Sequence, residues 1–185
     1  MTDATVAVAS PGARTGPARF IGRSRLRRDM EPLSTHGDFV VPLRFVLGLV
    51  AAGLGLAVMD AVMPRLPEGE TAPLVASGVL TRTHPDEAPR RLATVVHYVA
   101  GLLTGPLFVW LLLVTEGFFE PGIVATAAAD LALFVLMVGF FAVVVLPRSA
   151  VEPYRVGTIR RDWAASAAAY LLAVVPVVHV GSTLL

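Results

Sequence analysis

Four long apolar stretches dominate the chain, and each contains one aspartate or histidine. Each stretch has at least 21 residues, whereas about 20 helical residues are enough to cross the ~30 Å hydrocarbon core of a bilayer. The stretches are Leu43–Met63, Leu92–Val114, Ile123–Leu146 and Ala164–Leu185. We therefore expect an all-α, polytopic membrane protein with these four transmembrane helices, embedded in a lipid bilayer.

The connections between the four stretches indicate how the helices are arranged. They contain 28, 8 and 17 residues, and short connections join helices that lie next to each other and run in opposite directions. The domain 43–185 is therefore predicted to be a four-helix transmembrane bundle with antiparallel neighbours. Pro42 is expected in the first turn of the first helix, where its missing N–H is harmless. In the first connection, Leu74–Leu80 is too short to cross, and Thr83 is a candidate for capping the start of the second helix.

Residues 1–42 are not apolar enough to cross a membrane. They form an arginine-containing tail that we expect to be disordered. An alternative is that Met30 is the true start and that residues 1–29 are not translated. The tail contains Arg14, Arg19, Arg23, Arg25, Arg27 and Arg28.

Composition excludes several classes of function. The chain has no cysteine, which excludes disulfides, thiolate nucleophiles, iron–sulfur clusters and cysteine-ligated zinc. The net charge is +1, so no basic surface argues for a nucleic acid partner. The common sequence signatures of hydrolases, zinc proteases and nucleotide-binding proteins are absent. The sequence therefore favours a protein without enzymatic activity.

The distribution of arginine predicts the orientation in the cell membrane. The first and third connections carry eight arginines and the second carries none, and cytoplasmic connections are enriched in Lys and Arg. We therefore expect the first and third connections in the cytoplasm and both termini outside. The six arginines of the tail, if translated, make this comparison nearly even.

The ionisable residues of the apolar stretches are candidate functional residues, because a charge in hydrocarbon is unfavourable unless it is paired or hydrated. At a rise of ~1.5 Å per residue, Asp60 and His97 lie about 6 and 7.5 Å inside one face of the membrane. Asp130 and His179 lie about 10 and 9 Å inside the other face. Depth therefore predicts two couples, Asp60 with His97 and Asp130 with His179.

Three roles for these couples remain open. A couple can clamp two helices together, or it can serve as a proton relay or ion-coupled transport site, since imidazole titrates near neutrality. A metal site is a third reading, in which His84 joins Asp60 and His97. Two histidines cannot share a haem, because His97 and His179 lie roughly 14 Å apart along the membrane normal. No cofactor is expected.

Small residues next to the titratable groups are predicted to mark helix contacts. Gly53 and Ala57 share a helical stripe with Asp60, while Gly101 and Gly105 share one with His97. Small residues at such spacing let membrane helices approach closely. These faces also make a homo-oligomer or a larger membrane complex a reasonable expectation.

Two segments carry a resemblance to known proteins. They are Gly53–Pro64, with the sequence GLGLAVMDAVMP, and Val95–Gly101, with the sequence VVHYVAG. The chain here resembles small four-helix integral membrane proteins of unknown function from GC-rich prokaryotes, haloarchaea among them. The resemblance covers mainly the first two apolar stretches. It implies the architecture and no activity.

The leading hypothesis from the sequence is a small structural or accessory integral membrane protein whose Asp/His couples clamp its helices. The competing hypothesis is a small transporter or proton- or ion-coupled carrier that uses the same four residues.

Overall fold

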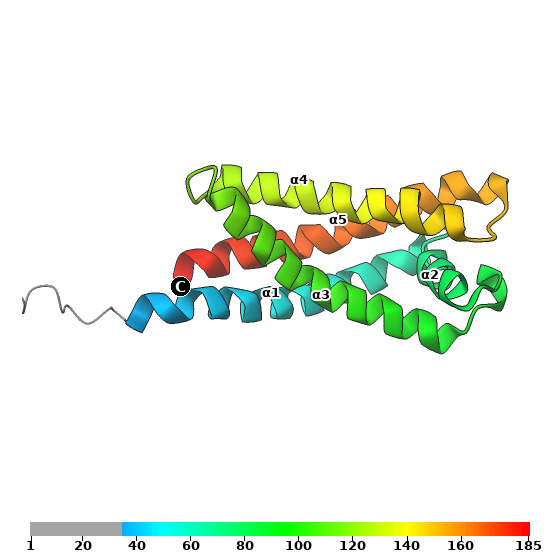
Figure 1. Ribbon diagram of the computed structural model, residues 1–185, viewed down its shortest axis with the longest axis horizontal. Coiled ribbons are helices and arrows are strands. Elements are labelled where there is room, and N and C mark those ends of the chain that lie inside the picture. The colour runs from blue at the N-terminus through cyan, green and yellow to red at the C-terminus, as the bar shows by residue number, and fades with distance from the viewer. Residues whose placement is uncertain (1–34) are drawn as a thin grey trace, which may run out of the picture. The chain divides into compact units, whose positions relative to one another are not determined.

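The computed structural model describes residues 35–185, and every regular element in this range is helical. Five α-helices follow one another along the chain (Figure 1). They are α1 (Thr35–Val62), α2 (Thr71–Thr81), α3 (Arg90–Glu116), α4 (Ile123–Phe140) and α5 (Pro153–Leu184). The predicted untranslated segment 1–29 and residues 1–34 of the tail predicted to be disordered lie outside the described range. Residues 35–42 of that tail belong to helix α1, so the predicted boundary at residue 42 is wrong.

Four helical segments are long and apolar enough to cross a membrane. They are Val40–Arg65, Arg90–Glu116, Ile123–Arg148 and Pro153–Leu184, with mean hydropathies between 1.8 and 2.7. The prediction of an all-α fold with four apolar spans is confirmed for the described residues. α2, with 11 residues, is too short to cross and lies in the first connection, over the segment predicted not to span.

Two helices begin earlier than the sequence predicts. α1 starts at Thr35 and contains Pro42 in its interior, so the prediction that Pro42 opens this helix is wrong. α5 starts at Pro153, which occupies its first turn, rather than near Ala164. Hydropathy detects only the apolar part of such a helix. In α5 the helix also includes the polar residues before Ala164, among which Arg155, Arg160 and Asp162 are hydrogen-bonded.

The chain enters α3 through a short 3₁₀ turn, Pro85–Glu87. The His84 ring caps this turn, since its Nδ1 accepts a hydrogen bond from the Asp86 N–H at 3.3 Å. The prediction that Thr83 caps the helix is therefore wrong, and α3 begins only at Arg90. α2 packs against α3 and is fastened to its start by a bond from the buried Ser77 hydroxyl to the Pro89 carbonyl, at 3.1 Å.

α4 continues as a π-helical turn, Phe141–Val145, which α5 helps to support. The Trp163 indole donates to the Met137 carbonyl at 3.3 Å, and the Arg160 guanidinium donates to the Ala142 carbonyl at 3.2 Å. A π turn disturbs the regular pattern of backbone hydrogen bonds. Side-chain donors from α5 thus bond carbonyls in and just before this turn.

Glycines allow α1 to approach its neighbours closely. A Cβ atom added to Gly105 would lie 2.1 Å from the Gly48 carbonyl oxygen, and one added to Gly101 would lie 2.4 Å from the Leu56 side chain. Gly53 and Ala57, by contrast, are exposed, and a Cβ on Gly53 would meet nothing within 4 Å. The prediction that these two residues pack within the bundle is wrong, because the buried stripe of α1 runs along a different face. That stripe includes Ala51, Ala52, Leu56, Met59 and Met63.

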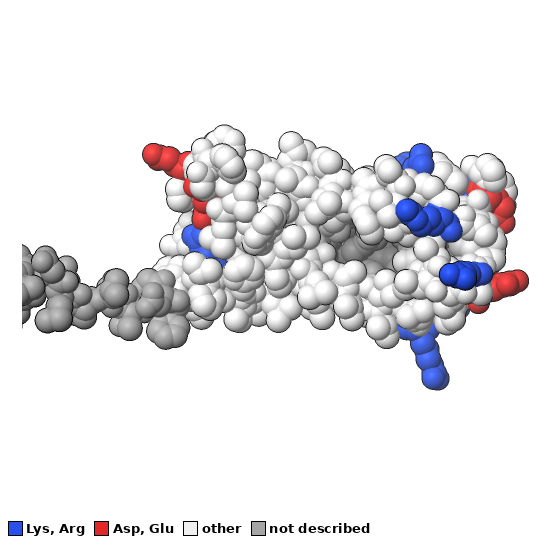
Figure 2. Space-filling model, viewed as in Figure 1, with Lys and Arg blue, Asp and Glu red and all other residues white. Residues whose placement is uncertain are grey.

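Charged side chains gather at the two ends of the helices. On the face shown in Figure 2 they lie at either end, with a broad uncharged band between them. Apolar side chains within the spans are widely exposed, for example Leu103 at 62% and Val143 at 72%. This surface would be unfavourable in water and is suited to a hydrocarbon environment.

Candidate functional site

The structure brings Asp60 and His97 together, and it adds Tyr98. His97 Nε2 lies 2.8 Å from Asp60 Oδ1, and the Tyr98 hydroxyl donates to Asp60 Oδ2 at 2.7 Å. Both oxygens of this α1 carboxylate are therefore bonded to consecutive residues of α3. The His97 side chain is only 9% exposed, whereas that of Asp60 is 36% exposed. Sequence reasoning missed Tyr98, although it adjoins His97 and carries a hydroxyl.

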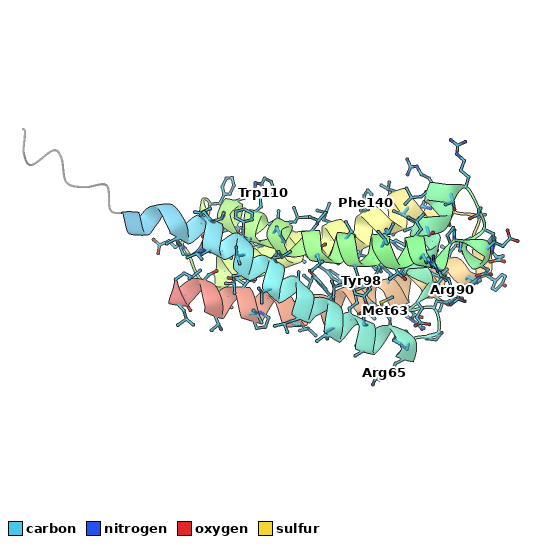
Figure 3. All side chains as sticks on the ribbon, turned by 90° about the horizontal axis from the view of Figure 1, so that it is seen from below. Met63, Arg65, Arg90, Tyr98, Trp110 and Phe140 are labelled. Atoms are coloured by element: carbon cyan, nitrogen blue, oxygen red, sulfur yellow. The ribbon has the colours of Figure 1, made fainter. Side chains whose placement is uncertain are left out.

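A polar cavity of about 700 Å³ borders this triad. It lies among α1, α2 and α3, and its lining includes Arg90 and Thr94 in addition to Asp60, His97 and Tyr98. Figure 3 places Tyr98 toward the end of the helices where Arg90 lies, with Trp110 toward the opposite end. The triad is therefore accessible to water or to small polar molecules from one side.

A second, apolar cavity of about 240 Å³ also borders His97. Residues of all five α-helices line it, including Phe140 and Trp163, and it also borders the π turn. The surface is visibly hollowed between α3 and α4 in Figure 2. His97 thus lines both a polar cavity and an apolar one.

The second predicted couple does not form. His179 Nδ1 lies 2.9 Å from the Thr126 hydroxyl, and Asp130 Oδ1 is buried without a hydrogen-bond partner among the described residues. Thr126 lies one helical turn before Asp130 on α4 and takes the position opposite His179. The prediction is wrong because equal depth does not ensure that two side chains face each other around the helix axes.

Arg44, in the first half of α1, forms an ion pair with Glu116, the last residue of α3. Arg44 Nη1 lies 2.6 Å from Glu116 Oε2, and both side chains are largely buried, at 16% and 14% exposure. This pair is a second polar link between α1 and α3, at the end of these helices away from Asp60.

The candidate metal triad does not assemble. His84 lies beside Asp86 and Glu152, with closest N–O distances of 3.7 and 3.5 Å, instead of joining Asp60 and His97. No group of three or more His, Cys, Asp or Glu side chains is placed to hold a metal ion between residues 35 and 185. The reason is the 3₁₀ turn, which turns His84 toward the start of α5.

A network centred on Arg155 is the polar group that sequence reasoning missed altogether. Its guanidinium bonds both oxygens of Glu68, at 2.8 and 2.9 Å, and also reaches Asp86 at 3.2 Å and Glu152 at 3.4 Å. Hydrogen bonds from Arg155, reinforced by the Thr71 hydroxyl, lower the pKa of Glu68 despite its partial burial. The network ties the first connection to the start of α5.

Asp162 extends this connection between segments. It is 1% exposed, and its Oδ2 accepts the Glu68 backbone N–H at 2.8 Å. The Arg161 side chain contacts its other oxygen at 3.1 Å. The available sequence signal was an aspartate beside an arginine pair at the edge of an apolar stretch. Such acids are common at loop ends, so the signal did not distinguish this one.

Comparison of the chain with protein-family models, with curated protein sequences and with solved structures finds no match.

Proposed function

We propose that this chain is a multi-pass integral protein of the cell membrane that serves as a structural or accessory component. The four apolar spans would form a bundle with antiparallel neighbours, and α2 would lie in the first connection. Support comes from the length and hydropathy of the four helical segments and from the charges gathered at their ends. The exposed Gly53 and Ala57 face is available for self-association or for a larger membrane complex.

The observation that carries this proposal is the pair of hydrogen bonds that join the Asp60 carboxylate to His97 and Tyr98 of α3. Interhelical hydrogen bonds in membranes contribute about 0.6–2 kcal/mol each. Here two such bonds hold α1 against α3 beside the close contact of Gly48 with Gly105. The triad acts as a clamp that sets the position of these two helices.

Two aspartate substitutions test the clamp. Asp60→Leu should lower the free energy of unfolding in detergent by about 1–2 kcal/mol, because it removes two interhelical bonds. Asp130→Leu is the matched control, since Asp130 Oδ1 has no partner among residues 35–185, and it should leave stability unchanged or raise it. Thermal melting followed by circular dichroism is the measurement. Equal melting temperatures for Asp60→Leu and the unmodified protein would refute the clamp.

The polar cavity favours a second candidate, a proton- or ion-coupled carrier that uses Asp60 and His97. The cavity borders both side chains, and a carboxylate and an imidazole are groups that can exchange a proton. Separation of Asp130 from His179 weighs against a relay of all four residues. Proteoliposomes loaded with a pH-sensitive dye distinguish the two functions. Proton flux in the unmodified protein that disappears in His97→Leu would establish the carrier.

The same proposal includes an orientation. We place the first and third connections in the cytoplasm and both chain termini outside. The eight arginines of those connections support this placement, since the second connection contains only acidic charges.

A further inference from the structure

Asp130 lies within the apolar helix α4, and its Oδ1 atom has no hydrogen-bond partner among residues 35–185. The span Ile123–Arg148 has 26 residues, which is about 39 Å of helix against a hydrocarbon core of ~30 Å. Asp130 lies about 10 Å from the start of this span. It therefore falls several ångströms inside the core if the helix is centred. One of its oxygens is buried and unbonded within the described part of the chain.

The residue lines a groove between α4 and α5. The groove has a volume of about 410 Å³, and its other lining residues are apolar. They are Leu131 and Phe134 of α4, and Ala168, Leu171, Leu172, Val175 and Pro176 of α5. Ala168, with its small side chain, lines the groove together with Leu131 and Leu172, which are 63% and 77% exposed. A depression flanked by protruding leucines matches the surface into which a second helix packs.

One backbone carbonyl of α5 lacks its regular helical donor. Pro176 has no N–H to donate to the carbonyl of Leu172 one turn earlier in this helix. Leu172 and Pro176 both line the groove with Asp130. None of the side chains that line the groove carries an N–H or a hydroxyl group, so they bring no donor to the Asp130 carboxylate.

We propose that this groove binds a transmembrane helix of another protein through a single cationic side chain that pairs with Asp130. Arginine fits best, because its guanidinium carries five N–H donors and can bond a carboxylate and a carbonyl together. A second copy of this chain would bring a second Asp130 and no cation to the same place. This inference rests on the proposed accessory role in a membrane and specifies the chemistry of the partner.

A designed peptide provides the probe. It consists of about 20 leucine and alanine residues, with one arginine about 10 Å from one end and a dansyl group attached. Binding to the full chain in phosphatidylcholine vesicles is measured by energy transfer from the tryptophans of the chain to this dansyl group. The matched peptide has leucine in place of the arginine. We expect the arginine peptide to bind about 3- to 30-fold more tightly, the range that corresponds to interhelical hydrogen bonds in membranes.

Variants of the chain separate the contributions of charge and groove. Asp130→Leu should abolish the preference for the arginine peptide, and Asp130→Glu should retain part of it. Glu120→Gln, which changes an exposed acid outside the spans, should leave the preference intact. Ala168→Phe should weaken the binding of both peptides, because the larger side chain fills the groove. Ala127→Phe, on an exposed part of α4 outside the groove lining, should leave the binding of both peptides unchanged.

Three results would overturn the inference. They are equal binding of the two peptides, a preference that persists in Asp130→Leu, and Asp130-dependent association between copies of the chain itself. Flotation of the vesicles tests the underlying proposal separately. A chain that does not float with lipid refutes membrane embedding, whereas a chain that floats but treats the peptides alike refutes only the partner.

Discussion

Asp60 and Asp130 are chemically identical and each is the only aspartate of its apolar stretch, yet their surroundings differ completely. Asp60 has both oxygens bonded to α3, whereas Asp130 faces a groove with an unbonded oxygen. A carboxylate bonded within the molecule stabilises the molecule. A carboxylate that lacks such a bond does not, and a partner that supplied a donor would remove the unfavourable burial of its Oδ1 atom.

Glu68 provides a prediction at this scale about pH. Its pKa is lowered below the ordinary 4.5 by Arg155, so the salt link contributes its full stability above pH 4.5. That contribution disappears as the pH falls from 4.5 through the lowered pKa. Glu68→Gln should lower the free energy of unfolding at pH 7 by about 1–3 kcal/mol and should reduce the loss of stability below pH 4.5.

Melting temperatures measured in detergent between pH 3 and pH 7 check this expectation. Glu87→Gln is the control, since Glu87 is an exposed acid of the same connection with no ion pair among the described residues. If the melting temperature falls equally between pH 4.5 and pH 3 in Glu68→Gln and in the unmodified protein, this salt link does not stabilise the fold.

At the scale of the elements, the contact between α1 and α3 combines close backbone packing with side-chain hydrogen bonds. Gly48 and Gly105 bring the two backbones together, and polar links lie on both sides of this contact. The Asp60 triad lies toward one end of the helices and the Arg44–Glu116 pair toward the other. Backbone contact in the middle and hydrogen bonds on either side hold the two helices in one register.

Two glycine substitutions test this contact. Gly105→Ala should destabilise the protein by about 1–3 kcal/mol, because the added methyl group would overlap the Gly48 carbonyl and force the helices apart. Gly53→Ala should be neutral or stabilising, since nothing lies within 4 Å of its added Cβ and alanine favours helix. Denaturant midpoints measured side by side check the difference. Similar losses in both variants would mean that α1 and α3 do not meet at Gly105.

At the scale of the whole molecule, the eight arginines of the first and third connections set the expected orientation. Cysteine labelling can test it directly because the chain has no native cysteine. Glu120→Cys, in the second connection, should react with a membrane-impermeant maleimide on intact cells. Glu87→Cys, in the first connection, should react only after permeabilisation. The reverse pattern would place the arginine-rich connections outside.

The sequence by itself determined the class of the fold. Four apolar stretches of bilayer length predict helices, because a helix satisfies every backbone hydrogen bond within one segment, and that requirement is local. The helical rise per residue also predicts that Asp60 and His97 lie at similar depths, because depth depends only on position along each helix.

Tertiary structure decided which side chains meet. Depth does not specify rotation about a helix axis, so the sequence could not separate the bonded Asp60 from the unbonded Asp130, nor the packed Gly105 from the exposed Gly53. The Arg155 network likewise depends on tertiary structure, which brings Glu68, in the turn before α2, and Asp86, in the 3₁₀ turn after it, to the start of α5. Contacts between residues that are distant in the chain depend on how the helices pack, and no local pattern encodes them.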